Sequence, residues 1–350
     1  MTFEEARAAF PVLERLAYLN AGTTGPLASA TVAAMDVELQ ADLERGRFGQ
    51  AYFDRMLALR GEARAGLAVL LGVEPANVAL TSSTTESCNI VLAGLGLDRG
   101  DDVVTSDEEH FGLLGALHAS GANVVVAPAK QVLEAVTPRT RLVAISHVSW
   151  VTGNHLDPEV IRAETGVPVL VDGAQSVGAL PVDAGAFDYY TVSAQKWLCG
   201  PDPLGALYVR DSEGLRVALP TYFSQESYDP DGSFTPTEGA ARFDSGWLSV
   251  PYLAGLIAAL DAPPEWRFER AREMTARCHE LLSDRFRVVT EPGRSTLVSF
   301  EAPGDAEEVA TRLNQQGVIV RNIPKTNLVR VSCGYWTSDG DLERLLAALH

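Results

Sequence analysis

The sequence predicts an α/β protein with a large domain, in which helices cover both faces of a mainly parallel sheet, and a small α+β C-terminal domain. Short apolar runs alternate with helix-like segments through the first 210 residues, a pattern typical of a parallel sheet between two helical layers. Pro263 and Pro264 mark a linker, after which the pattern becomes helix, strand, helix, strand. We predict an N-terminal segment at 1–16 that packs with the small domain, a large domain at 17–250 and a small domain at 251–350.

The composition restricts the class of partner. A net charge of −18 and a pI near 4.7 argue against nucleic acid or an anionic membrane as partner. The sequence has no run of 18 apolar residues, and MTFEEARAAF resembles a short amphipathic helix, not a signal peptide, so we expect a cytoplasmic protein without a membrane span. Four scattered cysteines predict neither disulfides nor a zinc site, and no metal is expected.

The N-terminal part of the large domain supplies a candidate anion site. A long helical region is expected at 29–71, broken around 46–49, followed by the strand VALT at 78–81. A Ser/Thr cluster then precedes a helical apolar pattern. A helix N-terminus offers free backbone N–H groups and a positive dipole end, which suit a dianionic phosphate. On its own, Ser-Thr-Thr-Glu would be only a helix N-cap.

The next two units repeat the order of strand, polar turn and helix. His110 follows a strand within residues 101–121, where a histidine without other motifs would be a surface or helix-capping residue. LVAIS at 142–146 is a buried strand, and His147 directly after it is expected to be structural.

The stretch 167–208 contains three strand-like runs, VPVLV, YYTV and LGALYV. The first ends in Asp172 with Gln175 three residues on, and the second ends in Ser193 with Lys196 three residues on. We expect these side chains to converge, because ligands of open α/β sheets bind beyond the carboxyl ends of the strands. A lysine with a carboxylate suits a pyridoxal phosphate (PLP) enzyme, in which lysine forms the Schiff base and the carboxylate keeps the pyridinium nitrogen protonated. A buried salt bridge between the two is the alternative.

VDGAQSVG followed by SAQKW resembles the cofactor segment of class V, fold-type-I PLP enzymes, a family that includes cysteine desulfurases, C–S lyases, kynureninases and isopenicillin N epimerase-like proteins. The resemblance covers nearly the whole chain and implies a PLP-dependent transferase-like fold. It implies that Lys196 carries the cofactor, Asp172 pairs with the ring nitrogen and Gln175 reaches the ring hydroxyl. The cofactor-binding residues that it implies are Thr84, Thr85, His110, Asp172, Gln175, Ser193 and Lys196.

The resemblance also implies where an amino-acid substrate binds. Arg330, in an Arg-Val-Ser segment, would hold the α-carboxylate bidentately. A surface arginine on an edge strand is the weaker alternative, because Arg330 lies in an apolar run where an unpaired charge would be costly. Asn20, Gly22 and Thr23 are candidate substrate contacts, although a plain connecting loop would have the same residues. Trp150, in a His-x-x-Trp-x-Thr-Gly stretch, resembles the C–S lyase branch, or is a core residue.

One segment departs from the family pattern. The family commonly has Arg-Phe-Glu-Ala-Gly-Thr, whose threonine reaches the phosphate of the partner subunit in a homodimer, whereas this chain has Arg-Phe-Asp-Ser-Gly-Trp at 242–247. Trp247 offers only an indole N–H donor. Ser245, Ser249 or that N–H is therefore a candidate to complete the phosphate site. The resemblance implies a homodimer with active sites near the interface.

The expected reaction follows from what the chain lacks. A desulfurase needs a cysteine on a mobile loop before the carboxylate-binding arginine, and the eight residues between Arg321 and Arg330 contain none, while Cys333 fits a core position. We therefore expect β-elimination from a cysteine, cystine, S-conjugate or sulfoxide, with Lys196 removing the α-proton and pyruvate and ammonia as products. Transamination, epimerisation, a desulfurase-like reaction and a non-enzymatic ligand-binding role are the alternatives.

Overall fold

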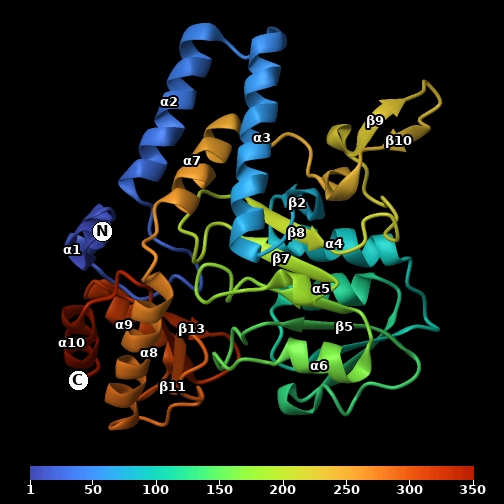
Figure 1. Cartoon of the computed structure of the whole chain (residues 1–350). Helices are drawn as coiled ribbons and strands as arrows, with labels where there is room; N and C mark the ends of the chain where they lie inside the picture. The colour runs from blue at the N-terminus through green and yellow to red at the C-terminus, as the bar shows by residue number, and fades with distance from the viewer.

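A seven-stranded sheet forms the centre of the protein in the computed structural model, which describes residues 1–350 (Figure 1). Its strands, in spatial order, are β2 (Val78–Thr81), β8 (Gly205–Val209), β7 (Tyr189–Ser193), β6 (Val169–Asp172), β5 (Thr140–Ser146), β3 (Asp102–Ser106) and β4 (Asn123–Ala127). Only β8 runs against the others, pairing antiparallel with both β2 and β7. The predicted mainly parallel sheet is confirmed.

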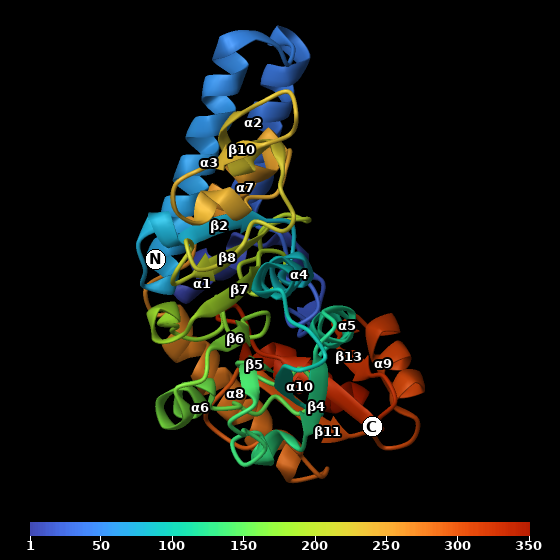
Figure 2. The ribbon, with the colours of Figure 1, turned by 90° about the vertical axis from the view of Figure 1, so that its right-hand side faces the viewer.

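Helices cover both faces of this sheet, as predicted. Along β5, Leu142 and Ala144 pack into one apolar cluster, and Val143 and Ile145 pack into another on the opposite face. The first cluster is closed by α4 (Thr84–Leu95) and α5 (Phe111–Ala119), and the second by α3 (Gly49–Leu71), α6 (Pro158–Thr165) and α7 (Val250–Asp261). Figure 2 shows α4 and α5 on one side of the strands and α6 on the other. Because both faces are covered, the central strands are apolar throughout.

Two long helices project from the sheet beside α7 (Figure 1). α2 (Ser29–Arg45) ends at Gly46, whose φ of 74° suits a residue without a side chain, and α3 begins at Gly49. The predicted break in the helical region is therefore confirmed. α7 packs against both helices and therefore belongs to the large body. The chain passes to the C-terminal body after α7, near Pro263 and Pro264.

The C-terminal body is a three-stranded antiparallel sheet covered by helices. Its strands are β11 (Leu297–Glu301), β14 (Leu328–Ser332) and β13 (Arg321–Ile323), and its helices are α8 (Arg267–Ser283), α9 (Ala306–Gln315) and α10 (Asp339–Ala348). Ser338 begins α10 with a capping box that includes Asp341. These elements share one apolar core, which agrees with the predicted α+β pattern.

The N-terminal segment attaches to this C-terminal body. In α1 (Phe3–Ala8), Arg7 forms an ion pair with Asp341 at 2.7 Å. β1 (Ala17–Tyr18) then pairs in parallel with β12 (Val318–Ile319). The boundaries of the three predicted segments stay predictions.

The remaining elements are short. β9 (Gln225–Tyr228) and β10 (Phe234–Pro236) form a projecting hairpin, and 3₁₀ helices occur at Pro11–Glu14, Pro75–Asn77, Ala129–Gln131, Ala184–Ala186, Tyr222–Ser224 and Gly239–Phe243. No helix has both the length and the apolar character that a membrane span requires.

Candidate active site

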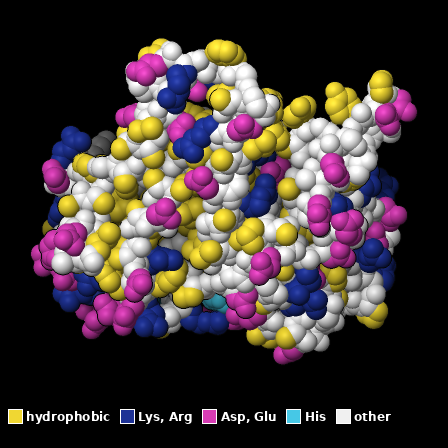
Figure 3. Space-filling view, turned by 45° about the horizontal axis from the view of Figure 1, so that its top comes forward, with side chains coloured by type: hydrophobic (Ala, Val, Ile, Leu, Met, Phe, Trp, Pro, Cys, Tyr) yellow, Lys and Arg dark blue, Asp and Glu magenta, His cyan; other side chains and the backbone are white.

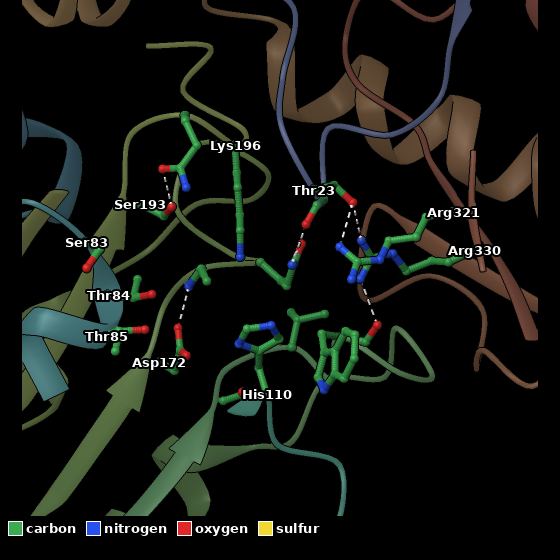
Figure 4. A pocket seen from close by; sticks show the side chains of 17 residues that line it. Thr23, Ser83, Thr84, Thr85, His110, Asp172, Ser193, Lys196, Arg321 and Arg330 are labelled. Atoms are coloured by element: carbon green, nitrogen blue, oxygen red, sulfur yellow. Dashed lines mark hydrogen bonds between the residues drawn. The ribbon is translucent and has the colours of Figure 1, made fainter. Parts of the chain in front are cut away.

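A polar cavity lies beyond the carboxyl ends of β5, β6 and β7, between the large sheet and the C-terminal strands (Figure 4). Only three of its seventeen lining residues are hydrophobic, so it suits a charged ligand. It is lined by Gly22, Thr23, Ser83, Thr84, Thr85, His110, Ser146, Val148, Trp150, Asp172, Ala174, Gln175, Ser193, Gln195, Lys196, Arg321 and Arg330. The structure thus brings together all predicted site residues except Asn20, whose Oδ1 instead accepts a hydrogen bond from Thr23 at 2.8 Å.

Lys196 reaches the cavity from the turn after β7. The backbone of this turn is held by Gly25, whose N–H donates to the carbonyl of Gln195 at 2.7 Å; a Cβ on Gly25 would lie only 2.2 Å from the Lys196 carbonyl oxygen. Nζ of Lys196 forms no hydrogen bond or ion pair within the chain. Burial, opposed by Asp172 and reinforced by Arg330 and Arg321, lowers the pKa of Lys196 to about 8. The amine is thus prepared for nucleophilic and base chemistry near neutral pH.

Asp172, at the end of β6, is buried but only half satisfied. Its Oδ1 accepts a hydrogen bond from the backbone N–H of Ala174 at 2.9 Å, while Oδ2 has no hydrogen-bond partner in the chain. No ion pair joins Asp172 to Lys196, so the alternative of a salt bridge between them is wrong. A buried carboxylate with a free oxygen favours a ligand cation or N–H donor in the cavity.

The amide of Gln175 has one possible orientation. Its Oε1 accepts from the indole N–H of Trp197 at 3.0 Å, and its Nε2 donates to the carbonyl of Gly22 at 2.8 Å. Since an indole only donates and a carbonyl only accepts, the oxygen and nitrogen cannot be exchanged. The second N–H of Nε2 has no partner in the chain, and Gln175 is therefore a hydrogen-bond donor for a ligand in the cavity.

The N-terminus of α4 forms one end of the cavity. Ser83 caps the helix by accepting from the N–H of Glu86 at 3.1 Å, while the hydroxyls of Thr84 and Thr85 have no partner within the chain. These hydroxyls, with the free amides and the helix dipole, form a site for a dianion. The capping prediction and the phosphate prediction are thus compatible.

The segment 242–247 and Ser249 lie apart from the phosphate end of their own chain. Ser245 donates to Glu86 at 2.5 Å and is buried away from the cavity, and Ser249 is the N-cap of α7. Trp247 is 61% exposed and packs on Phe53. None of these three residues lines the cavity of its own chain, and their contact with the phosphate of a partner subunit stays a prediction.

His110 caps a helix and lines the cavity, while its contact with the cofactor stays a prediction. As N-cap of α5, it accepts on Nδ1 from the N–H of Gly112 at 3.0 Å, and it also lines the cavity. Its ring meets Trp150 edge to face at 4.9 Å. Burial, with Lys196 nearby, lowers the pKa of His110, which keeps the ring neutral. A neutral ring beside the cavity can cover a flat cofactor ring.

Two arginines meet at the opposite end. Arg330 on β14 and Arg321 on β13 are directly opposite in register, and both donate to Oγ1 of Thr23, at 3.5 and 3.2 Å. Neither guanidinium pairs with a carboxylate, although Arg330 is buried and its Nε has no partner. Burial and Arg321 lower the pKa of Arg330 to about 9. This excess of positive charge calls for an anion.

The sequence alone does not assign Arg321 to the site. Its strand register places it beside Arg330, and no motif in the sequence reports that register. Trp150 contributes its carbonyl, which accepts from Arg330 at 2.7 Å, and its buried indole N–H has no partner. Trp150 is therefore a cavity residue, not only a core residue.

Comparison with known proteins identifies relatives along the whole chain. The family model described as aminotransferase class-V matches residues 17–345. An isopenicillin N epimerase from Streptomyces clavuligerus is 28% identical over 99% of this chain and 97% of its own, and the cysteine desulfurase CsdA of Escherichia coli is 28% identical over 98% and 96%.

A solved complex of the cystine C–S lyase C-DES with its reaction product cysteine persulfide has a TM-score of 0.88 at 28% identity, covering 97% of this chain and 98% of that one. Its similarity extends over the large sheet and the C-terminal body alike. With the family match, it gives the chain the fold-type-I architecture of PLP enzymes. The protein belongs to the class V aminotransferase family.

Proposed function

We propose that this protein is a PLP-dependent C–S lyase that removes sulfur from an L-cysteine-type amino acid by β-elimination. The observation that carries the proposal is the division of one cavity into a phosphate end, a lysine with a low pKa and an arginine pair without counterions. The products are pyruvate, ammonia and the sulfur leaving group, which is a thiol, a persulfide or, from a sulfoxide, a sulfenic acid, and one water is consumed.

The residues of the cavity fit the cofactor. The unpartnered hydroxyls of Thr84 and Thr85 and the helix N-terminus suit its phosphate, the free Oδ2 of Asp172 suits a pyridinium N–H, and the spare N–H of Gln175 suits a phenolic oxygen. Lys196 supplies the amine that bonds to it. When bound, PLP provides the electron sink that stabilises negative charge at the substrate Cα.

The chain's own groups then determine which bond breaks. Arg330 and Arg321 hold the α-carboxylate, which fixes the orientation of the substrate Cα. Nζ of Lys196 would take the α-proton of the bound substrate, and the Cβ–S bond would break with its electron pair leaving on sulfur. The rings of His110 and Trp150 form one wall of the cavity and exclude water from that side of the bound substrate. No further acid is required when the leaving sulfur is a stable thiolate or persulfide.

Persulfide transfer to an enzyme cysteine finds no support. All four cysteines are buried, and none lines the cavity. Cys333, on the residue after β14, packs in the C-terminal core, as expected from the sequence. This argues for elimination over a desulfurase mechanism that uses a protein thiol.

Epimerisation is the second candidate, because an isopenicillin N epimerase is among the relatives. One experiment separates the candidates. The purified holoenzyme is incubated with L-cysteine, L-cystine, S-conjugates and sulfoxides, and pyruvate, sulfide and the D-enantiomer are measured. Elimination predicts pyruvate in a 1:1 ratio to the released thiol, persulfide or, from sulfoxides, sulfenic acid, and none from Lys196→Ala. Recovery of D-amino acid, or of a keto acid that retains sulfur, would replace the proposal by epimerisation or transamination.

A further inference from the structure

A second cluster of chemically active side chains lies outside the active-site cavity. His147 follows β5, His155 pairs as an isolated bridge with Val148, and Glu159 lies in the first turn of α6. Nε2 of His147 is 3.9 Å from Oε2 of Glu159, and Nε2 of His155 is 3.8 Å from Oε1. All three potential ligand atoms lie within 4.8 Å of one another.

A chain of hydrogen bonds fixes the tautomer of His147. Oγ of Ser176 donates to the carbonyl of Gly173 at 3.1 Å, so its oxygen accepts from the hydroxyl of Tyr190 at 2.6 Å. Because the Tyr190 hydroxyl donates its only proton to Ser176, its oxygen accepts a hydrogen bond from Nδ1–H of His147 at 2.5 Å. Because Nδ1 carries the proton of this buried ring, Nε2 carries a lone pair.

This arrangement places two acceptors face to face. Oε2 of Glu159 is buried and has no hydrogen-bond partner, and the atom opposite it is the unprotonated Nε2 of His147. Two buried acceptors with no proton between them are costly. A cation bound between them removes that cost and uses both lone pairs.

His155 can supply a third lone pair. Its Nδ1 lies 3.2 Å from Oδ1 of Asp157, and donation to that carboxylate leaves Nε2 free, which is the usual support for a metal-bound histidine. In the other tautomer, Nδ1 accepts from the N–H of Asp157 at 3.1 Å and from Nη2 of Arg294 at 3.2 Å, and Nε2–H would be 3.8 Å from Glu159, too far to bond. A metal ion on Nε2 therefore requires the first tautomer, with Arg294 turned wholly onto Asp157. Arg294 forms an ion pair with Asp157. The negative charge of Glu159 is therefore left without a counterion from this guanidinium.

We propose that His147, His155 and Glu159 bind one zinc-like divalent ion, with water as the fourth ligand. Two imidazoles and one carboxylate are a known zinc donor set, and around a tetrahedral ion the ligand atoms are separated by about 3.4 Å. The gaps from each histidine to Glu159 must therefore close by about 0.5 Å, which the 43%-exposed side chain of Glu159 permits. His155 also lines a surface pocket with Leu156 and Val160, which gives the ion a route in.

The ion would have a structural role. It would tie the loop after β5 to α6, and the chain from His147 through Tyr190 and Ser176 ends at Gly173, the residue after Asp172. The backbone N–H of His147 also donates to the Asp172 carbonyl at 3.0 Å. A bound metal therefore stabilises the strand end that presents Asp172 to the cavity.

The test uses tag-free holoenzyme and zinc alone. Wild-type protein is expected to retain one equivalent after equilibrium dialysis against micromolar zinc and to gain a few degrees in Tm. Glu159→Gln removes one ligand at a half-exposed position and should lower the zinc affinity at least tenfold. Glu164→Gln makes the same change at an exposed position on the same helix and should retain wild-type binding.

His155→Gln serves as a second ligand variant, with Tm in the absence of zinc as the check that each variant is folded. Failure of the wild type to retain zinc, or equal retention by Glu159→Gln and Glu164→Gln, would overturn the proposal. If zinc bound only to the cofactor or to surface groups, neither substitution would alter its retention, and Glu159→Gln and Glu164→Gln would retain equal amounts.

Discussion

Gly22 shows how closely the site is packed at the level of single residues. Its N–H donates to Oγ of Ser332 at 3.1 Å, and its carbonyl accepts from Gln175. A Cβ here would lie 2.8 Å from Nη2 of Arg330 and 3.0 Å from both Gln175 Oε1 and Ser332 Oγ. The glycine thus lets the N-terminal turn approach both the cofactor end and the carboxylate end.

Gly22→Ala should therefore disturb catalysis more than stability. Displacing Arg330 and Gln175 by part of an ångström is expected to lower kcat/KM on the order of 100-fold. Gly61→Ala is the matched control, because its Cβ meets nothing within 4 Å and alanine favours the helix α3. Steady-state kinetics and Tm of both variants check this; wild-type kinetics for Gly22→Ala would show that the turn yields freely.

Lys196 gives a prediction for pH. Its pKa is lowered, so the reactive neutral amine is already present near pH 8, whereas an ordinary lysine is neutral only above pH 10. The rate at which apo-protein incorporates PLP should rise about tenfold per pH unit below the midpoint and level off above about pH 8. Stopped-flow absorption of the bound cofactor measures it.

Arg330→Gln should move that midpoint upward, because Arg330 is one of the two charges that lower the lysine pKa. The exposed Arg312 on α9 provides the control, as Arg312→Gln leaves the cavity charge unchanged. A wild-type midpoint near pH 10 would mean that burial does not act on Lys196 in the free protein.

At the level of elements, β13 and β14 hold two like charges opposite each other. Such a pair is destabilising in an antiparallel sheet by a few tenths to about 1 kcal/mol. Arg321→Gln should therefore leave Tm unchanged or slightly raised while KM for the amino acid rises roughly tenfold. Arg312→Gln, on the adjacent α9, should change neither. A fall in Tm without a change in KM would assign Arg321 a structural role instead.

The strands also show what the sequence could and could not predict. Strand-end positions for Asp172 and Ser193 followed from apolar runs alone, since a buried parallel strand needs apolar residues on both faces. The direction of β8 was missed, although residues 194–204 contain no helix and are short for a parallel crossover. The Arg321–Arg330 register and the meeting of His147 with Glu159 depend on tertiary packing, which no local pattern encodes.

At the level of the whole molecule, apolar side chains remain uncovered. Figure 3 shows hydrophobic atoms over the face formed by the projecting helices, where Val37, Leu43 and Phe48 are exposed. Trp247 is 61% exposed beside Tyr222, which is 56% exposed. Exposed aromatic clusters of this kind are common at protein interfaces. They support the homodimer that the family resemblance implies.

The expected dimer would have twice the mass of the 37.5 kDa chain, measurable by light scattering after size exclusion. Trp247→Ala should raise the dimer dissociation constant at least tenfold, because a buried interface tryptophan contributes about 2 kcal/mol or more. Val69→Ala, at an 83%-exposed position near the other end of α3, should not. A monomeric wild type would leave the phosphate end to α4 alone.

The pairing of β1 with β12 joins residues that are synthesised at opposite ends of translation. Leu19 and Gly22 take their places only when Ser332 is available to bond them. On the ribosome, the residues of the phosphate end at α4 are therefore synthesised long before those of the arginine end on β13 and β14. A chain that ends before β13 and β14 lacks the arginine pair proposed to bind the substrate carboxylate, so this recognition would be completed only near the end of synthesis.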